Sequence, residues 1–523
     1  MDIPRHKFVA MQSENNDMNS FDANNSHIRH PSRVRNGMFS ATLRVLALCL
    51  ALLIYVALTV DLIANSQGLG AYTLLLMGYL YVETRNLWAR EPYLFWINPV
   101  VLASIFTFVM AFGIANLPFF LPEDVVALVG LQPIATPWMN QLMLLVVLGA
   151  IFMWVGYSSG MGRGLGQMLE RSRVLRKLLA PSFRINRPAL YACLAISLIA
   201  KLWAIKLGVY GYSSTYDQLT AAAAYIQYFA MANSLGKLAL VGVALQCFSV
   251  PRASLVDWRL LWLVMGYEVA FGFLSGFKSA VGTPFIIVGI VYYSKRNRFP
   301  RWLIPAVVAS VMAAYAVIEP FRAARNENAD FVGTSLGSIV TTIISAGSVN
   351  ADDGGERAST WLKLLARSNL TYVGSLGIEY AAENELPEGS PKFLKNIILA
   401  PAHAFLPRFL WDSKPLQNDG LWYTNVVIGH DNYSSTDMSL FTYLNFAGGP
   451  LAVILGCLLV GIFQRGLFDG LRHFGGGGLI VFLGLLGTLA NPDSSFNSFI
   501  ISIIRFLPIL VVVQYALLRR SRR

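Results

Sequence analysis

Long apolar runs separated by short polar segments make up most of this chain. Twelve such runs come close to or exceed the roughly 20 residues that an α-helix needs to cross a bilayer. The pattern therefore predicts an all-α polytopic membrane protein with about 12 transmembrane helices. The eleventh run is short and is expected to tilt or to be partly re-entrant. The predicted spans are 41–64, 70–87, 94–115, 138–158, 188–209, 221–248, 259–276, 279–295, 302–320, 438–463, 478–490 and 496–518.

A long hydrophilic interval, from 321 to 437, interrupts the apolar pattern. Composition agrees with the membrane class, because 55% of the residues are hydrophobic and 13% are charged, whereas a soluble domain carries about a quarter charged residues. We therefore divide the chain into a disordered cytoplasmic tail (1–39), transmembrane helices one to nine (40–320), an outer loop that carries the candidate site (321–437), transmembrane helices ten to twelve (438–518) and a basic cytoplasmic tail (519–523).

The formal net charge of +12 reflects topology rather than nucleic-acid binding. Basic residues follow every even-numbered span, whereas the loops after spans one, three, five and eleven contain no Lys or Arg. Because cytoplasmic loops carry the excess of Lys and Arg, this distribution predicts both termini in the cytoplasm and the 321–437 interval on the outer face. The basic amphipathic segment 161–187 is expected to lie on the cytoplasmic surface, with a structural or lipid-binding role.

The outer interval is too long for a passive connection in a compact membrane protein. Apolar residues at helical spacing in 334–345 and 360–382 predict short helices that lie on or dip into the membrane, followed by an Asn-, Gly- and Ser-rich connection at 418–436. Between them, residues 400–415 (APAHAFLPRFLWDSKP) combine three prolines with aromatic and charged residues. That proline density excludes an ordinary membrane helix, so this stretch is predicted to be held at the membrane surface.

Several cations in and beside this interval contradict the positive-inside trend, which makes them candidates for binding an anionic substrate. A guanidinium group presents a planar fork that binds phosphate oxygens in bidentate fashion, so a cationic pocket at the outer surface suits a diphosphate. Ordinary solvated surface residues are the alternative. The cations are Lys278, Arg322, Arg325, Arg357, Arg367, Arg408, Lys414 and Arg505, the last of which lies inside the final span.

Two other features receive structural interpretations. Lys237 and Glu268 lie inside predicted spans, where an ionisable group is costly and either pairs with another charge or serves a function. We expect an ion pair between these two residues, with a functional role as the alternative. The glycine run Gly475–Gly478 lacks the spacing of a phosphate-binding loop and is expected to be a flexible connector.

Two short motifs stand at the end of the outer interval and the start of the next span. Residues 407–415 read PRFLWDSKP and residues 443–449 read YLNFAGG. Residues 404–463 thereby resemble the Wzy-type oligosaccharide repeat-unit polymerases, whose patterns are PR-x-[IL]-W-x-x-KP and an Asn-Phe-Gly segment. Phe441 stands where family members often carry a glutamate, and Ala447 replaces a glycine. Asp437 lies one helical turn before Phe441 and could substitute for the glutamate.

The resemblance implies an enzyme that joins polyprenyl-diphosphate-linked oligosaccharide units at the outer face of a bacterial inner membrane. A growing chain on one lipid carrier is transferred to a sugar hydroxyl on a second carrier, and the first lipid diphosphate leaves. The expected catalytic residues are His403, Asp437 and Glu379 as candidate bases, together with Arg367 and Arg408. The expected substrate-binding residues are Lys278, Arg322, Arg325, Arg357, Trp411, Lys414, Asn445 and Arg505.

No cofactor is expected, and no divalent metal is expected because no carboxylate cluster resembles a DxD metal site. The expected partners are the lipid-linked oligosaccharide, membrane lipids, and chain-length-regulator and flippase proteins. Two alternative functions stay open. An O-antigen ligase or another lipid-linked-sugar glycosyltransferase shares the chemistry and differs only in the acceptor. A flippase or transporter of the same lipid would show internal repeats, and no repeat relates the two halves of this sequence.

Overall fold

A computed structural model describes most of the chain. The described residues are 32–120, 135–179, 185–211, 218, 221–249, 253–296, 298–327, 337, 340, 369–406, 410–411, 414, 419–429, 436–491 and 495–518. Within these ranges, the side chains of 32–38, 223–224, 311, 315 and 319–327 fall outside the description. The backbone of the described residues is helical, and no β-strand forms among them.

Each predicted span coincides with a helix or, for the third span, with a run of short helices. The helices that carry the spans are α3 (Ser32–Thr59), α4 (Asn65–Arg90), the run η1 (Pro92–Ile97), α5 (Pro99–Ala103), η2 (Ser104–Gly113) and η3 (Ile114–Phe120), α7 (Pro137–Ser158), α10 (Arg187–Lys206), α12 (Ala223–Ser249), α13 (Leu255–Leu274), α14 (Lys278–Arg296), α15 (Leu303–Glu327), α22 (Leu440–Arg472), α23 (Gly475–Ala490) and α24 (Phe496–Leu517).

Within the described part of the chain, seven helices are long and apolar enough to cross a membrane. The helical backbone pairs its polar groups within the segment, as a membrane-spanning segment requires. The seven are Phe39–Thr59, Pro99–Phe120, Pro137–Ser158, Arg187–Lys206, Tyr225–Ser249, Leu440–Arg472 and Phe496–Leu517. The first candidate span starts at Phe39, close to the predicted 41. Its helix α3 already begins at Ser32, so the tail expected to be disordered up to residue 39 is helical from Ser32 onwards.

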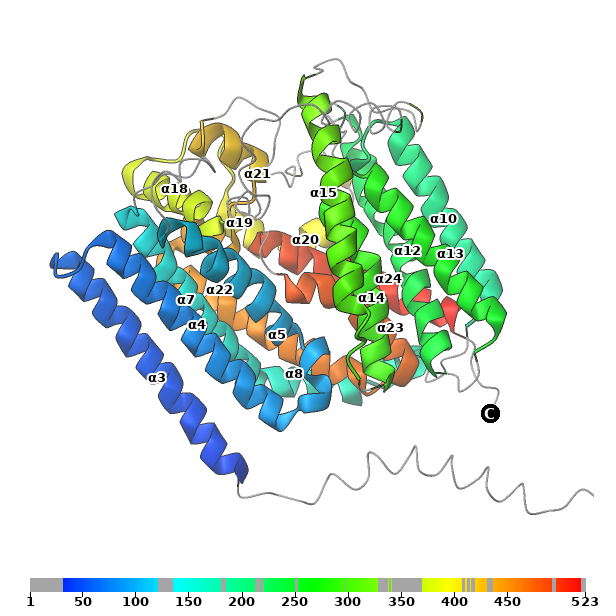
Figure 1. The fold of residues 1–523 in the computed structure, drawn as a ribbon, viewed down its shortest axis with the longest axis horizontal. Coiled ribbons are helices and arrows are strands. Elements are labelled where there is room, and N and C mark those ends of the chain that lie inside the picture. Colours follow the sequence, from blue (N-terminus) through cyan, green and yellow to red (C-terminus); the bar gives the residue numbers. More distant parts are fainter. Residues whose placement is uncertain are drawn as a thin grey trace, which may run out of the picture.

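The helices form two groups that α23 and α24 join (Figure 1). One group contains α3, α4, α5, α7 and α22, and the other contains α10 and α12 to α15. The helix α23 packs against α5 and α22 of the first group and against α12 of the second, while α24 packs against α22, α10 and α12. This arrangement places the last two helices at the centre of the molecule.

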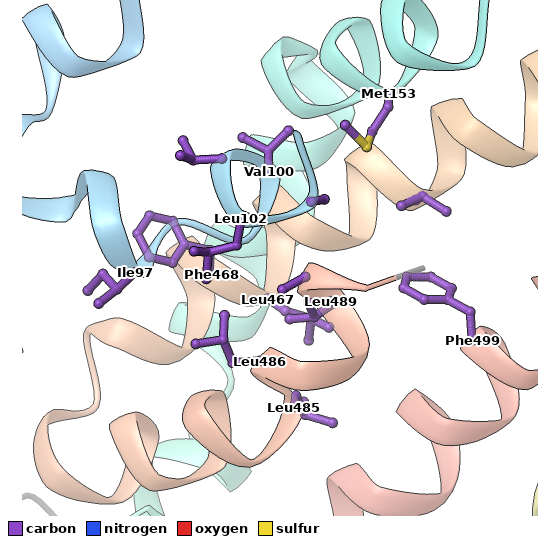
Figure 2. Close-up of a cluster of buried hydrophobic side chains, with 14 of the residues drawn as sticks. Ile97, Val100, Leu102, Met153, Leu467, Phe468, Leu485, Leu486, Leu489 and Phe499 are labelled. Carbon is purple, nitrogen blue, oxygen red and sulfur yellow. The ribbon is translucent and has the colours of Figure 1, made fainter. Parts of the chain in front are cut away.

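The closest packing joins α7 to α22. A Cβ added at Gly156 would lie 2.1 Å from the carbonyl oxygen of Leu458, and one added at Gly461 would lie 2.0 Å from that of Met153. Small residues therefore allow the two backbones to touch, as they do at membrane helix interfaces. An apolar cluster extends this contact to the neighbouring helices (Figure 2). Its labelled residues are Ile97, Val100, Leu102, Met153, Leu467, Phe468, Leu485, Leu486, Leu489 and Phe499.

The glycine run Gly475–Gly478 is not a flexible connector, contrary to expectation. It forms the first turn of α23. A Cβ at Gly478 would lie 2.0 Å from the carbonyl oxygen of Leu471. The glycines therefore allow the start of α23 to touch the end of α22, and this contact outweighs the low helix propensity of glycine.

The buried intramembrane ion pair joins Glu268 to Lys201 rather than to Lys237. Lys201 on α10 donates to Glu268 on α13 across 2.8 Å, and the side chains are only 2% and 5% exposed. The ammonium of Lys201 also lies 4.1 Å from the ring centroid of Tyr267, within range of a cation–π contact. The expectation of a structural pair named the wrong lysine because α10 and α13 are distant in sequence yet meet through their packing on α12.

The described part of the outer interval contains short helices. These are α18 (Leu370–Glu383), α19 (Phe393–Ile398), α20 (Ala400–Phe405), α21 (Asp419–Trp422) and η6 (Tyr423–Val427). The helix expected at 360–382 is therefore found from Leu370 onwards, whereas 334–345 lies outside the described residues except for 337 and 340. The prediction of an irregular connection at 418–436 was wrong for its first half, which folds into α21 and η6. This folding buries Tyr423 fully and Trp422 in part. In Figure 1, α18, α19 and α21 gather at one end of the molecule.

Candidate functional site

Lys414, in the segment that follows α20, caps the C-terminal end of this short helix. The ammonium of Lys414 donates to the backbone carbonyl oxygens of His403, at 2.7 Å, and of Leu406, at 2.8 Å. Carbonyl groups in the last turn of a helix have no partner within the helix, and basic side chains satisfy them well. Lys414 is 6% exposed, so this contact fixes the turn after α20 beneath the surface.

Arg505 of α24 reaches the same place from the other side. Its Nη2 donates to the carbonyl oxygen of His403 at 3.1 Å, and its Nε lies 3.5 Å from the carbonyl oxygen of Ala404. The close approach depends on small residues, because Ala400 and Ala404 of α20 pack directly against Ile501 of α24. The helix α20 therefore lies along the N-terminal half of α24. The carbonyl oxygen of His403 accepts hydrogen bonds from both Lys414 and Arg505.

The imidazole of His403 is buried beside these cations. It is 1% exposed, and neither ring nitrogen has a hydrogen-bond partner among the described residues. Its ring centroid lies 5.1 Å from that of Trp411, with the planes tilted by 39°. Burial, followed by the charge of Lys414, lowers the pKa of His403 below its ordinary value of 6.5. The imidazole is therefore neutral at pH 7 and able to accept a proton.

A second polar cluster forms at the start of α22. Asp437 accepts a hydrogen bond from the backbone N–H of Ser439 at 3.3 Å. Ser439 has φ 66°, a left-handed conformation that is uncommon outside glycine. Its hydroxyl caps the helix by accepting from the N–H of Thr442, and Thr442 donates to the carbonyl oxygen of Gly374. Burial raises the pKa of Asp437 to about 6.

Asp419 joins this cluster and escaped the sequence prediction. The N–H of Thr436 donates to the carbonyl oxygen of Gly420 at 3.3 Å and to the hydroxyl of Thr424 at 2.9 Å. Asp419 directly precedes Gly420, and Asp437 directly follows Thr436. The hydrogen bond between Gly420 and Thr436 therefore brings the backbones of the two aspartates close together. Burial also raises the pKa of Asp419 to about 6. The only sequence signal was an acid placed directly before an aromatic segment, Gly-Leu-Trp-Tyr.

Aromatic side chains connect the short outer helices with α22. Phe393 of α19 stacks on Phe446 of α22, with centroids 5.0 Å apart and planes at 14°. Trp422 of α21 meets both rings edge-on, at 5.5 Å and 5.6 Å. Tyr443 and Tyr380 complete the cluster. Asn445, predicted to bind substrate, is half-buried beside Phe446.

The YLNFAGG motif marks a break in α22. Gly448 is extended, with φ 175°, and Gly449 is left-handed, with φ 65°. Pro450 follows, which suits the first turn of a new helix. Residues 440–447 thus form a separate short helix that carries Asn445, and the long apolar helix starts at Pro450.

The structure brings together four of the predicted site residues, His403, Trp411, Lys414 and Arg505. Asp437 and Asn445 lie at the start of α22, Glu379 is half-buried in α18, and Lys278 begins α14, which packs against α12, α13 and α15. Arg357, Arg367 and Arg408 lie outside the described residues, as do the side chains of Arg322 and Arg325 at the end of α15.

Metal-ligating side chains do not gather in the described part of the chain. No group of three or more His, Cys, Asp or Glu residues there could hold a metal ion. The carboxyl of Asp437 accepts a hydrogen bond from the neutral backbone N–H of Ser439. Whether the reaction needs a divalent metal stays a prediction from the sequence.

Comparison with known proteins places the chain in a family. A family model described as "Domain of unknown function (DUF8712)" matches residues 191–522. The match covers more than half of the chain and extends from α10 to the end of α24, including His403, Lys414 and Arg505. No curated protein and no solved structure matches the chain. The chain therefore belongs to the DUF8712 family.

Proposed function

We propose that this protein is a membrane glycosyltransferase that polymerises polyprenyl-diphosphate-linked oligosaccharide units at the outer face of a bacterial inner membrane. The proposed topology has twelve spans, both termini in the cytoplasm and residues 321–437 outside. Loop charges support it, and so does the gathering of α18, α19 and α21 at one end of the molecule (Figure 1). The motifs at 407–415 and 443–449 support the reaction type by their resemblance to repeat-unit polymerases.

The observation that carries the proposal is the convergence of Lys414 and Arg505 beside the buried imidazole of His403. A guanidinium group has five N–H donors in a rigid fork. Two of the donors of Arg505 are directed at the carbonyl oxygens of His403 and Ala404. The fork is thereby oriented, and its remaining edge suits the oxygens of a diphosphate.

The proposed reaction is a displacement at an anomeric carbon. The hydroxyl oxygen of the acceptor sugar forms a bond to that carbon, and the bond from the carbon to the lipid diphosphate breaks with its electron pair going to the diphosphate. Lys414 and Arg505 stabilise the charge that develops on the leaving group. Arg408 and Arg367, which the sequence also assigns to the site, are proposed to contribute further positive charge.

A base must take the proton of the acceptor hydroxyl. We assign this role to His403, because its pKa is lowered and both ring nitrogens lack a partner among the described residues. A buried polar group without a hydrogen bond is costly, and an acceptor hydroxyl would supply the missing bond. Asp437, with a pKa of about 6, is the second candidate base.

The test uses purified protein and a purified lipid-linked repeat unit in liposomes. A ladder of oligosaccharides that grows from the repeat unit alone supports the polymerase. Transfer that occurs only when lipid A core is added identifies a ligase instead. Movement of the lipid-linked sugar across the bilayer without formation of a new glycosidic bond identifies a flippase, and either of these results would overturn the proposal.

A further inference from the structure

Two short basic helices follow one another in the chain, α8 (Gly160–Arg171) and α9 (Arg173–Leu178). Figure 1 shows α8 at the end of the molecule opposite α18 and α21. The helix α8 starts directly after the apolar helix α7, and Ser159 caps it by accepting from the N–H of Gly162 at 3.2 Å. Because α7 has the length and apolarity of a membrane span, α8 begins at the depth where the chain leaves the hydrocarbon layer.

One face of α8 is occupied by protein. Gly162 and Gly166 are buried against α22, where a Cβ at either position would lie 2.9 Å from the side chain of Arg465 or Asp469. The opposite face is open. Met161 is 68% exposed and Met168, two turns later, is 63% exposed. On α9, Val174 is 65% exposed. The pair of helices therefore exposes apolar side chains away from the protein core.

Basic residues surround these apolar side chains. Residues 160–178 contain five basic residues and a single acid, Glu170. The guanidinium of Arg176 donates to the backbone carbonyl oxygen of Glu170, which draws α9 towards the end of α8. The basic residues are Arg163, Arg171, Arg173, Arg176 and Lys177. All five are exposed, as Met161, Met168 and Val174 are. Short amphipathic helices that expose both cationic and apolar side chains are typical of the interface of an anionic membrane.

An open cavity of about 540 Å³ lies where the two helices meet. Met168 and Leu169 supply apolar surface, while Gln167, Arg171 and Ser172 supply hydrogen-bond donors. The combination suits a phosphate group that is attached to acyl chains better than it suits a free anion, which gains nothing from Met168.

We propose that α8, α9 and this cavity bind the headgroup of an anionic phospholipid from the leaflet at this end of the molecule. Arg171 and Ser172 contact the phosphate, and Met161 and Met168 contact the acyl region. The site is separate from the one proposed for the lipid-linked sugar, and the proposal does not depend on the protein being a polymerase. It gives the exposed arginines a partner that their position at the membrane boundary makes continuously available.

Native mass spectrometry of the full-length protein in a neutral detergent tests the site. Phosphatidylglycerol should form adducts at lower concentration than phosphatidylcholine. The double variant Arg171→Gln/Arg173→Gln should weaken phosphatidylglycerol binding by about 25-fold, since each basic residue near an anionic membrane contributes about fivefold. The matched control Lys392→Gln/Lys395→Gln removes two cations that are also exposed but lie in the 321–437 interval, and it should leave the affinity unchanged.

A second arm separates a lipid site from a free-anion site. Met161→Gln/Met168→Gln should also weaken phosphatidylglycerol binding, and inorganic phosphate should not displace the lipid. Equal binding of the two lipids, or an unchanged affinity in Arg171→Gln/Arg173→Gln, would overturn the proposal. Displacement of the lipid by inorganic phosphate would identify a free-anion site and would overturn it equally.

Discussion

Lys414 and Arg505 donate to the same backbone carbonyl oxygen, that of His403, at 2.7 Å and 3.1 Å. One of these cations belongs to the outer interval and the other to the last apolar helix. Two like charges held so close together repel each other, more strongly where water is excluded. An anion placed between them would relieve the repulsion. We propose that the geometry that anchors α20 to α24 also serves to bind a diphosphate.

Removal of one of these cations should weaken binding of the leaving group. Arg505→Gln keeps a donor and loses the charge, so the affinity for polyprenyl diphosphate should fall by about ten- to a hundredfold, as expected for a hydrogen bond to a charged group. Arg259→Gln is the matched control, because Arg259 is exposed at the start of α13. Binding measured by microscale thermophoresis in detergent distinguishes the two variants, and equal affinities for both would remove Arg505 from the site.

The lowered pKa of His403 predicts a pH profile. The rate of sugar transfer should be constant above about pH 7 and should fall as the pH drops through the lowered pKa, because protonated imidazole cannot accept a proton. His403→Gln should lose about 10²- to 10⁴-fold in rate and should lose this acid limb as well. Single-turnover rates give the profile. An acid limb that persists in His403→Gln and disappears in Asp437→Asn would assign the base to Asp437.

The break in α22 should depend on one glycine. Gly449→Ala places a side chain at φ 65° and ψ −158°, with no neighbour within 4 Å. The substitution therefore costs backbone strain of about 1–3 kcal/mol rather than a clash. The melting temperature of the Gly449→Ala variant should fall, and the short helix that carries Asn445 should lose order. Gly487→Ala is the control, because this position is helical and also open. A melting temperature as low in the control as in Gly449→Ala would exclude strain as the cause.

The ion pair between Lys201 and Glu268 should stabilise the second group of helices only as a pair. Lys201→Met leaves a buried carboxylate without its partner and should cost about 3–5 kcal/mol. The double variant Lys201→Met/Glu268→Gln should recover most of that loss, because both charges are then gone. Thermal unfolding in detergent compares the variants. A double variant that is no more stable than the single variant would show that Lys201 acts mainly through its contact with Tyr267.

Hydropathy predicted the position of the helices. A membrane span must be apolar along its whole length, so the requirement is visible in the local sequence. The sequence predicted that Lys414 and Arg505 belong to one site, but not that they contact the same carbonyl oxygen. The contact itself depends on how α20 packs along α24, through Ala400 and Ala404, which no local pattern reports. The same limit explains the wrong lysine for Glu268. Lys201 becomes its partner only when α10 and α13 come together.

Asp419 illustrates a different limit. Its raised pKa results from burial, and that burial is produced by α21 and η6 in a segment whose composition predicted a connection. Trp422 folds this segment by packing on Phe393 and Phe446. The prediction for Gly475–Gly478 also failed. A glycine run usually indicates flexibility, but here the glycines allow a close contact between two helices. In both places tertiary packing decided the local structure.

The measurement that tests the central claim most directly is the length distribution of the sugar chains that purified protein makes from a lipid-linked repeat unit. The wild type and Arg259→Gln should both produce a ladder of increasing length. Arg505→Gln and His403→Gln should produce none within the same time while remaining folded by size-exclusion chromatography and thermal unfolding. A wild-type protein that forms no new glycosidic bond, or an Arg505→Gln variant whose ladder equals that of the wild type, would contradict the account.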